Sequence, residues 1–190
     1  MLWINFLHLY QPATADAHII KEATEKSYSR IIRALEEYPQ IKFTLNINGC
    51  LLERWEELGY EKLIKRINAL VKKGQIELTG TAFYHPILPL IPEEEAKKQI
   101  KEQEIILKKY FGNNIKLKGF FLPEIAYSSQ IGKLLKKLGY QWLILGEMSF
   151  SGKLNKVDFN KIYEDKENKL KAVFRSRQIS KTYVPDKLLN

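Results

Sequence analysis

Cysteine and long apolar runs are what this 190-residue sequence has least of. Cys50 is the single cysteine, which excludes an internal disulfide and a cysteine metal cluster. No run reaches the roughly 18 apolar residues of a membrane-spanning helix, and the first residues lack the basic leader of a signal peptide. We therefore expect a soluble, cytoplasmic protein. Because 45% of the residues are hydrophobic, we also expect one domain with a substantial core.

Arginine is scarce as well, although the net charge is +9. Six of the 31 basic residues are arginine, and the lysines recur in segments 62–73 and 97–109, among glutamate or apolar residues at helical spacing. That pattern is typical of a solvated helix face. A glycine-rich phosphate loop, zinc-ligand spacing and nucleic-acid motifs are all missing. The sequence therefore favours neither a nucleic-acid partner, nor a membrane, nor a cofactor.

Apolar runs alternate with helical patterns along the chain. Strands are predicted over residues 2–9, 41–47, 75–79, 120–122, 140–145 and 170–174. Helices are predicted over residues 18–38, 51–58, 61–73, 92–110 and 129–138, with a polar loop over 149–168 and a short helix from Pro185. Repeated strand–helix units indicate parallel strands with right-handed crossovers. The predicted fold class is α/β, with about six strands in an open sheet or an incomplete (β/α) barrel.

Polar residues stand where these strands end. They are His8, Gln11, Asn46 or Asn48, Glu77, Glu124, Glu147, Arg175 and Arg177. The carboxyl ends of parallel strands share one rim, where α/β proteins bind ligands. Strand ends also meet ordinary polar loops, so the pattern has a purely structural alternative.

Glu124 has the most defined setting. It follows the buried run 120–122 and Pro123, which has no N–H for a central ladder, so Glu124 should stand at a strand's carboxyl end. His85 lies in the proline-rich loop 80–92, where it either packs or contacts substrate. Glu77, within an apolar strand, either pairs with a residue such as Arg175 or His8 or binds substrate hydroxyls.

Aromatic residues accompany these polar groups, which suits a sugar ligand. They are Trp3, Phe83, Tyr84, Phe121 and Tyr127. Aromatic rings stack on pyranose faces, while carboxylates and amides bind hydroxyls. Retaining cleavage of a glycosidic bond needs two carboxyl groups about 5–5.5 Å apart, one as nucleophile and one as acid and base.

Three short segments resemble motifs of glycoside hydrolase family 57. His8 to Pro12 is similar to the first motif, His-x-His-Gln-Pro, with Tyr10 replacing the second histidine. Gly74 to Leu78 is similar to the second, a Gly-x-x-Glu segment, and the following Tyr84 to Pro89 is also familiar from this family. Phe121 to Glu124 is similar to the third, Trp-Leu-x-Glu, with phenylalanine replacing tryptophan.

The resemblance implies an α-glucan-active enzyme with an incomplete (β/α)₇ barrel and no cofactor or metal. It implies that Glu124 is the nucleophile. It implies substrate-binding roles for His8, Gln11, Glu77, His85 and Phe121.

The family's acid/base aspartate belongs to a fourth, Asp-Gly-Glu-like motif that no segment of residues 1–190 matches. The aspartates of the last third, Asp158, Asp165 and Asp186, lie outside any such motif. We therefore expect residues 1–190 to be one partial catalytic barrel, lacking later strands and a carboxyl-terminal helical region, with little or no activity alone.

Two alternatives stay open at this point. One is a non-catalytic carbohydrate-binding protein that keeps the barrel without the chemistry. The other is a metal-dependent polysaccharide deacetylase with a related partial barrel, in which His8, His85 and a carboxylate would hold the metal; the lack of a helical histidine pair argues against it.

Overall fold

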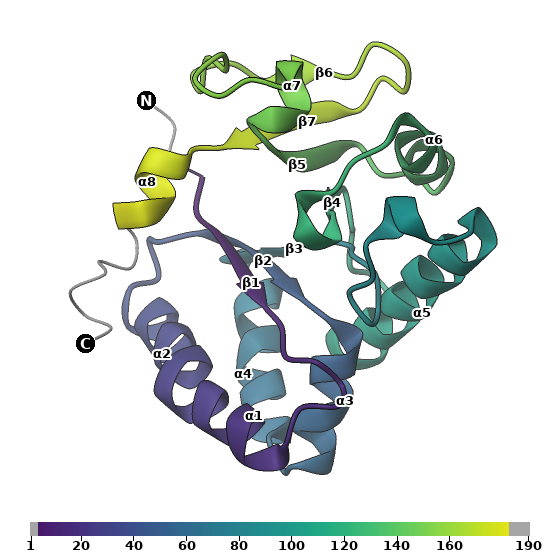
Figure 1. Cartoon of the computed structure of the whole chain (residues 1–190). Coiled ribbons are helices and arrows are strands. Elements are labelled where there is room, and N and C mark those ends of the chain that lie inside the picture. The colour runs from purple at the N-terminus through teal and green to yellow at the C-terminus, as the bar shows by residue number, and fades with distance from the viewer. Residues whose placement is uncertain (1–3, 183–190) are drawn as a thin grey trace.

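The computed structural model describes the backbone of residues 4–182 and the side chains of residues 4–180 (Figure 1). Two sheets are present, in the orders β1-β2-β3 and β4-β5-β7-β6. Their strands are β1 (Phe6–Leu9), β2 (Phe43–Ile47), β3 (Ile76–Leu78), β4 (Gly119–Phe121), β5 (Trp142–Gly146), β6 (Tyr163–Glu164) and β7 (Lys171–Arg175). All pairs are parallel except β6 with β7. The predicted parallel α/β fold is therefore confirmed, and β6 is an addition that the sequence pattern missed.

Gly80 joins the two sheets. Its N–H donates to the Gly119 carbonyl at 2.9 Å, and its carbonyl accepts from the Phe121 N–H at 2.9 Å. The result is a parallel bridge between Gly80 and Phe120 that links the end of β3 to β4. A Cβ at Gly80 would lie 2.3 Å from the hydroxyl oxygen of the buried Tyr140, so only glycine fits there. Six parallel strands thus follow one another in a curved layer.

Helices lie on the outer side of this layer, as Figure 1 shows. They are α1 (Ala17–Ala23), α2 (Ser29–Glu37), α3 (Gly49–Glu57), α4 (Glu61–Lys72), α5 (Glu93–Phe111) and α6 (Ser129–Lys137). The predicted helix over 18–38 is split by a π-helical stretch, η1 (Thr24–Tyr28), which helical periodicity does not reveal. Packing forms two apolar clusters, one beneath each sheet.

The predicted polar loop over 149–168 contains two short elements, α7 (Met148–Ser151) and β6. Phe150, Tyr163 and Phe174 hold this segment together through edge-on ring contacts at 4.9–5.8 Å between centroids. A further helix, α8 (Arg177–Thr182), was also not predicted, and the helix predicted from Pro185 lies outside the described residues. Within residues 4–182, none of the helices has the length and apolarity needed to cross a membrane.

Gln103 of α5 fixes the carboxyl end of β2. Its side-chain nitrogen donates to the Ile47 carbonyl at 2.8 Å, and its oxygen accepts from the Gly49 N–H at 2.7 Å. All three groups are buried, so this side chain satisfies two backbone groups where water does not reach. The β2–α3 connection is thereby held in register with the outer helix.

We predict that Gln103→Leu lowers the free energy of unfolding by about 1–3 kcal/mol, because it leaves a buried carbonyl and a buried N–H unpaired. Urea denaturation would measure the loss. The same change at the exposed Gln130 of α6 is the control and should shift stability by less than about 0.5 kcal/mol. Equal losses of stability at the two positions would contradict the role of Gln103 in satisfying two buried backbone groups.

Candidate active site

A hydrogen-bonded chain of side chains crosses the carboxyl ends of β1, β2 and β3. Asn46 donates its amide to the Thr79 hydroxyl at 3.0 Å and to the Gly80 carbonyl at 3.4 Å. Its side-chain oxygen lies 2.7 Å from His8 Nδ1. Because that oxygen only accepts, Nδ1 of His8 carries the proton. Asn46 is fully buried, and thus sets the rotamer and the tautomer of His8.

His8 is neutral in this environment. Burial lowers its pKa from 6.5 to about 4, the Asn46 hydrogen bond opposes that effect, and the neighbouring His85 adds to it. With Nδ1–H bonded to Asn46, the neutral ring presents Nε2 as a bare acceptor. Such a nitrogen can accept a hydrogen bond from a hydroxyl group of a ligand.

Four rings gather beside this chain of hydrogen bonds. His85 lies nearly parallel to Tyr10 and to His8, with centroids 4.3 and 4.8 Å apart. Phe121 of β4 is tilted against His8 at 4.7 Å. The rings come from β1 and the residue after its end, from the loop after β3, and from β4, so the site spans the junction of the two sheets. They form an aromatic wall of the kind on which a sugar ring can pack.

Glu124 lies at the end of β4, in the single turn η3 (Pro123–Ile125). Its side chain is 68% exposed, although Phe121 and Pro123 before it are buried. The backbone is left-handed at Glu124 (φ 55°) and again at Ile125 (φ 54°). Each such residue costs about 1–3 kcal/mol unless it is glycine, and strain of this kind concentrates at functional sites.

His85 is the side chain that meets Glu124. Its Nε2 lies 3.4 Å from Oε1 of the carboxylate, and the imidazole is almost buried while the carboxylate is not. His85 also has a left-handed backbone (φ 61°). Three of the five non-glycine residues with positive φ in residues 4–182 are therefore at this one site.

Comparison with known proteins identifies the family. The profile of Glycosyl hydrolase family 57 matches residues 4–183, nearly the whole chain. The chain belongs to glycosyl hydrolase family 57. The predicted family is thereby confirmed, while the roles of individual residues stay predictions.

Relatives and solved structures agree with the family. An α-amylase of Pyrococcus horikoshii is 37% identical over 150 residues, which cover 77% of this chain and 23% of that protein. A 4-α-glucanotransferase of Thermococcus litoralis is 30% identical over 151 residues, covering 77% of this chain and 22% of that protein. The crystal structure of a 4-α-glucanotransferase from the same organism superposes with a TM-score of 0.86 at 26% identity, covering 97% of this chain and 29% of that chain.

The chain thus spans less than a quarter of the length of these curated relatives. A putative polysaccharide deacetylase from Mycobacterium smegmatis also superposes, with a TM-score of 0.62 at 14% identity over 96% of this chain and 63% of that one. At that identity the likeness is one of fold alone. Among the described residues, no three histidine, cysteine, aspartate or glutamate side chains are grouped as metal ligands.

Of the residues expected at this family-57 site, the structure gathers His8, His85, Phe121 and Glu124. Gln11 is linked to this group through Tyr28 and the backbone of Tyr10. Its amide donates to the Tyr28 hydroxyl at 3.1 Å, and that hydroxyl donates to the Tyr10 carbonyl at 3.1 Å. Gln11 therefore supports the loop after β1 through its side chain.

Glu77 lies within β3 and not past its carboxyl end. It precedes Thr79 by two residues on the same face of β3 and pairs in register with Thr44. Its side chain is exposed and makes no hydrogen bond or ion pair with any residue in 4–180, so the pairing considered with Arg175 or His8 is not formed. It borders a groove of about 520 Å³ beside the loop 112–116.

The other strand-end residues form hydrogen bonds with loops next to the strands. Asn48 donates to the Ala82 carbonyl at 2.7 Å, the buried Glu147 accepts from the Asn155 N–H at 3.0 Å, and Arg175 donates to the Ser180 hydroxyl at 3.1 Å. Asn46 was a candidate as a strand-end amide, but Thr79 was missed, because a threonine in a strand has no signal of its own.

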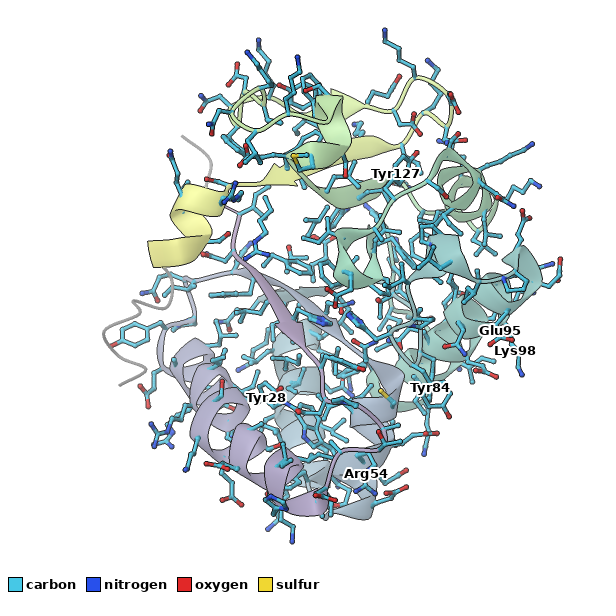
Figure 2. All side chains as sticks on the ribbon, in the orientation of Figure 1. Tyr28, Arg54, Tyr84, Glu95, Lys98 and Tyr127 are labelled. Carbon is cyan, nitrogen blue, oxygen red and sulfur yellow. The ribbon has the colours of Figure 1, made fainter. Side chains whose placement is uncertain are left out.

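The aspartates beyond residue 150 are engaged locally as well. Asp165 accepts hydrogen bonds from the Tyr127 hydroxyl and, at 2.8 Å, from the Asn168 amide. Figure 2 labels Tyr127 beside α6, below the β6–β7 hairpin. Asp158 accepts from the Asn160 N–H at 3.0 Å, and Asp186 lies outside the described residues.

We predict that Glu124→Gly is more stable than Glu124→Ala by about 1 kcal/mol, because glycine adopts the left-handed backbone without a Cβ clash. At the helical Glu94 of α5 the order should reverse by about the same amount. Urea denaturation of the four variants measures both differences. If the alanine variant were the more stable one at both positions, the backbone at Glu124 would not be strained.

His8 should make stability depend on pH. Its folded pKa of about 4 lies below the unfolded 6.5, so between these values the unfolded chain binds more protons and stability falls as the pH falls. The difference between a pKa of about 4 and one of 6.5 corresponds to a loss of roughly 3 kcal/mol in the free energy of unfolding, and this loss is complete below pH 4. Urea denaturation from pH 7 to 4 should show a smaller loss for His8→Gln than for the unmodified chain. Identical pH dependence would contradict this burial effect.

Proposed function

We propose that this chain forms part of the catalytic barrel of an enzyme that hydrolyses or transfers α-glucan chains by a retaining, double-displacement mechanism. The observation that carries the proposal is the exposed carboxylate of Glu124, held on a strained turn at the end of β4 and 3.4 Å from His85, whose ring packs on His8. The family and the names of its amylase and glucanotransferase relatives support the substrate class.

In the first step, Glu124 attacks the anomeric carbon from one face of the sugar. The glycosidic bond breaks, its oxygen leaves with a proton from an acid, and a glycosyl ester forms on the Glu124 carboxylate. In the second step, the acid, now deprotonated, takes a proton from water or from the hydroxyl of an acceptor sugar. The oxygen of that molecule then bonds to the anomeric carbon, and the bond to Glu124 breaks. The anomeric configuration is retained because the carbon is inverted twice.

The neighbouring residues would hold the sugar. The bare Nε2 of His8 accepts a hydrogen bond from a sugar hydroxyl, and the rings of Tyr10 and Phe121 offer apolar faces. Gln11 and Glu77 would take substrate-binding or supporting roles, as the family resemblance implies. The acid is not assigned, because no aspartate of residues 1–190 lies in a matching motif.

Without that acid, we expect residues 1–190 to release little or no sugar from maltooligosaccharides, since general acid catalysis contributes about 10²–10⁴-fold. A donor with a leaving group that needs no proton isolates the role of Glu124. α-Maltosyl fluoride is such a donor: the new bond joins a Glu124 oxygen to C1, the C1–F bond breaks, and fluoride leaves with the electron pair.

We predict that α-maltosyl fluoride labels the protein once, with the maltosyl group on Glu124, because this carboxylate is exposed and free to attack. Intact-protein and peptide mass spectrometry would locate the label. Glu124→Gln should abolish labelling, and the matched change at the exposed Glu94 should leave it unchanged.

Two outcomes would oppose the proposal. Labelling of another residue would move the nucleophile elsewhere in the chain. No labelling, together with maltoheptaose binding that Glu124→Ala does not alter, would favour a carbohydrate-binding protein without this chemistry.

A further inference from the structure

His85 has a firmly anchored backbone. The Asn48 amide donates to the Ala82 carbonyl at 2.7 Å, which also accepts from the His85 N–H at 3.3 Å. The preceding Tyr84 N–H donates to Gln99 Oε1 at 3.0 Å. Figure 2 labels Tyr84 on the same side of the view as Glu95 and Lys98 of α5. The loop therefore presents Tyr84 to the α5 side, while the imidazole of His85 lies against His8 and Tyr10.

The position of the proton on His85 follows from its surroundings. Nδ1 is buried and has no hydrogen-bond partner among the described residues, whereas Nε2 faces Glu124 Oε1 at 3.4 Å. A carboxylate only accepts hydrogen bonds, so Nε2 is the nitrogen that carries the proton. Burial also lowers the pKa of His85 from its usual value, an effect that Glu124 opposes, and the ring is therefore neutral near pH 7.

The contact with His85 involves only one of the two carboxylate oxygens of Glu124. Oε1 faces His85, and no other described residue forms a hydrogen bond or ion pair with this carboxylate. The separation of 3.4 Å is longer than an ordinary hydrogen bond, as catalytic hydrogen bonds often are before substrate binds. A mostly exposed glutamate would otherwise sample several rotamers.

We propose that His85 is a positioning residue for Glu124, donating from Nε2 to one carboxylate oxygen so that the other is directed at the sugar. This inference rests on the proposed role of Glu124 as nucleophile. It replaces the substrate-binding role that the family resemblance suggests for His85. The nearly parallel packing of His85 on His8 and Tyr10 supports the assignment, because these rings fix the plane in which Nε2 donates.

Two substitutions separate the donor from the ring. His85→Phe keeps the aromatic packing but removes the N–H, whereas His85→Gln removes the ring and keeps an N–H donor of similar reach. If His85→Phe fails to fold, His85→Asn takes its place, since asparagine tolerates a positive φ but is too short to reach Glu124. His18, exposed on α1, supplies the matched control His18→Gln.

The first measurement is the rate of labelling of Glu124 by α-maltosyl fluoride. We expect His85→Phe to slow it by about 10–100-fold, the usual worth of a hydrogen bond to a charged group, while His85→Gln restores most of the rate and His18→Gln changes nothing. Equal rates for the Phe variant and the unmodified chain would overturn the inference while leaving Glu124 as the nucleophile.

The second measurement does not require any reaction. Nitrogen-15 NMR of the imidazole should show the Nε2–H tautomer for His85, and an NMR titration should show its pKa falling further in Glu124→Ala, because the carboxylate raises it. The other titratable groups that face His85 and Glu124 are His8 and Tyr10, and Glu124→Ala leaves both of them in place. An Nδ1–H tautomer, or an unchanged pKa, would overturn the inference. A falling pKa without any labelling would sustain the contact and refute the proposed function instead.

Discussion

The backbone bridge at Gly80 is the constraint on which the site depends. The first sheet carries His8 and the loop with His85, and the second carries Phe121 and Glu124. Only the paired hydrogen bonds of Gly80 with Gly119 and Phe121 join one sheet to the other among the described strands. The absence of a side chain at Gly80 lets Tyr140 pack against it. The bridge at Gly80 thus holds the strand before the His85 loop beside the strand that leads to Glu124.

The fold was more predictable from sequence than the geometry of the site. Strands such as β2 and β5 are apolar runs bounded by turn residues, and α5 begins after Pro92 with three glutamates, so local patterns define them. The two residues of β6 are too few to form a pattern. The π-helical stretch η1 keeps a helical periodicity, so the sequence cannot distinguish it from the helices on either side.

For the site residues too, the position along the fold was predictable from sequence, whereas the contacts and backbone conformation were not. His8 and Glu124 were expected at one rim because each stands at the carboxyl end of a strand, and this needs only the order of elements. The bond between His8 and Asn46 depends on strand register, which sets His8 opposite Asn46. The left-handed backbone of Glu124 runs against the preference of that residue, so no local rule predicts it. The exposure of the Glu77 side chain could not be predicted, because an apolar strand does not show which of its faces is covered, and its substrate-binding role stays a prediction.

Charge around Glu124 is as important as shape. The chain carries an excess of nine positive charges, yet the described lysine and arginine ion pairs are made with other carboxylates, mostly on exposed helices. A lysine or arginine beside Glu124 would stabilise its negative charge before reaction and lower its nucleophilicity. Instead the nearest partner is His85, which burial keeps neutral, and behind it lies His8, which burial also keeps neutral. In the proposed mechanism, the two buried imidazoles would therefore orient a carboxylate and a sugar hydroxyl without neutralising the negative charge that a nucleophile needs.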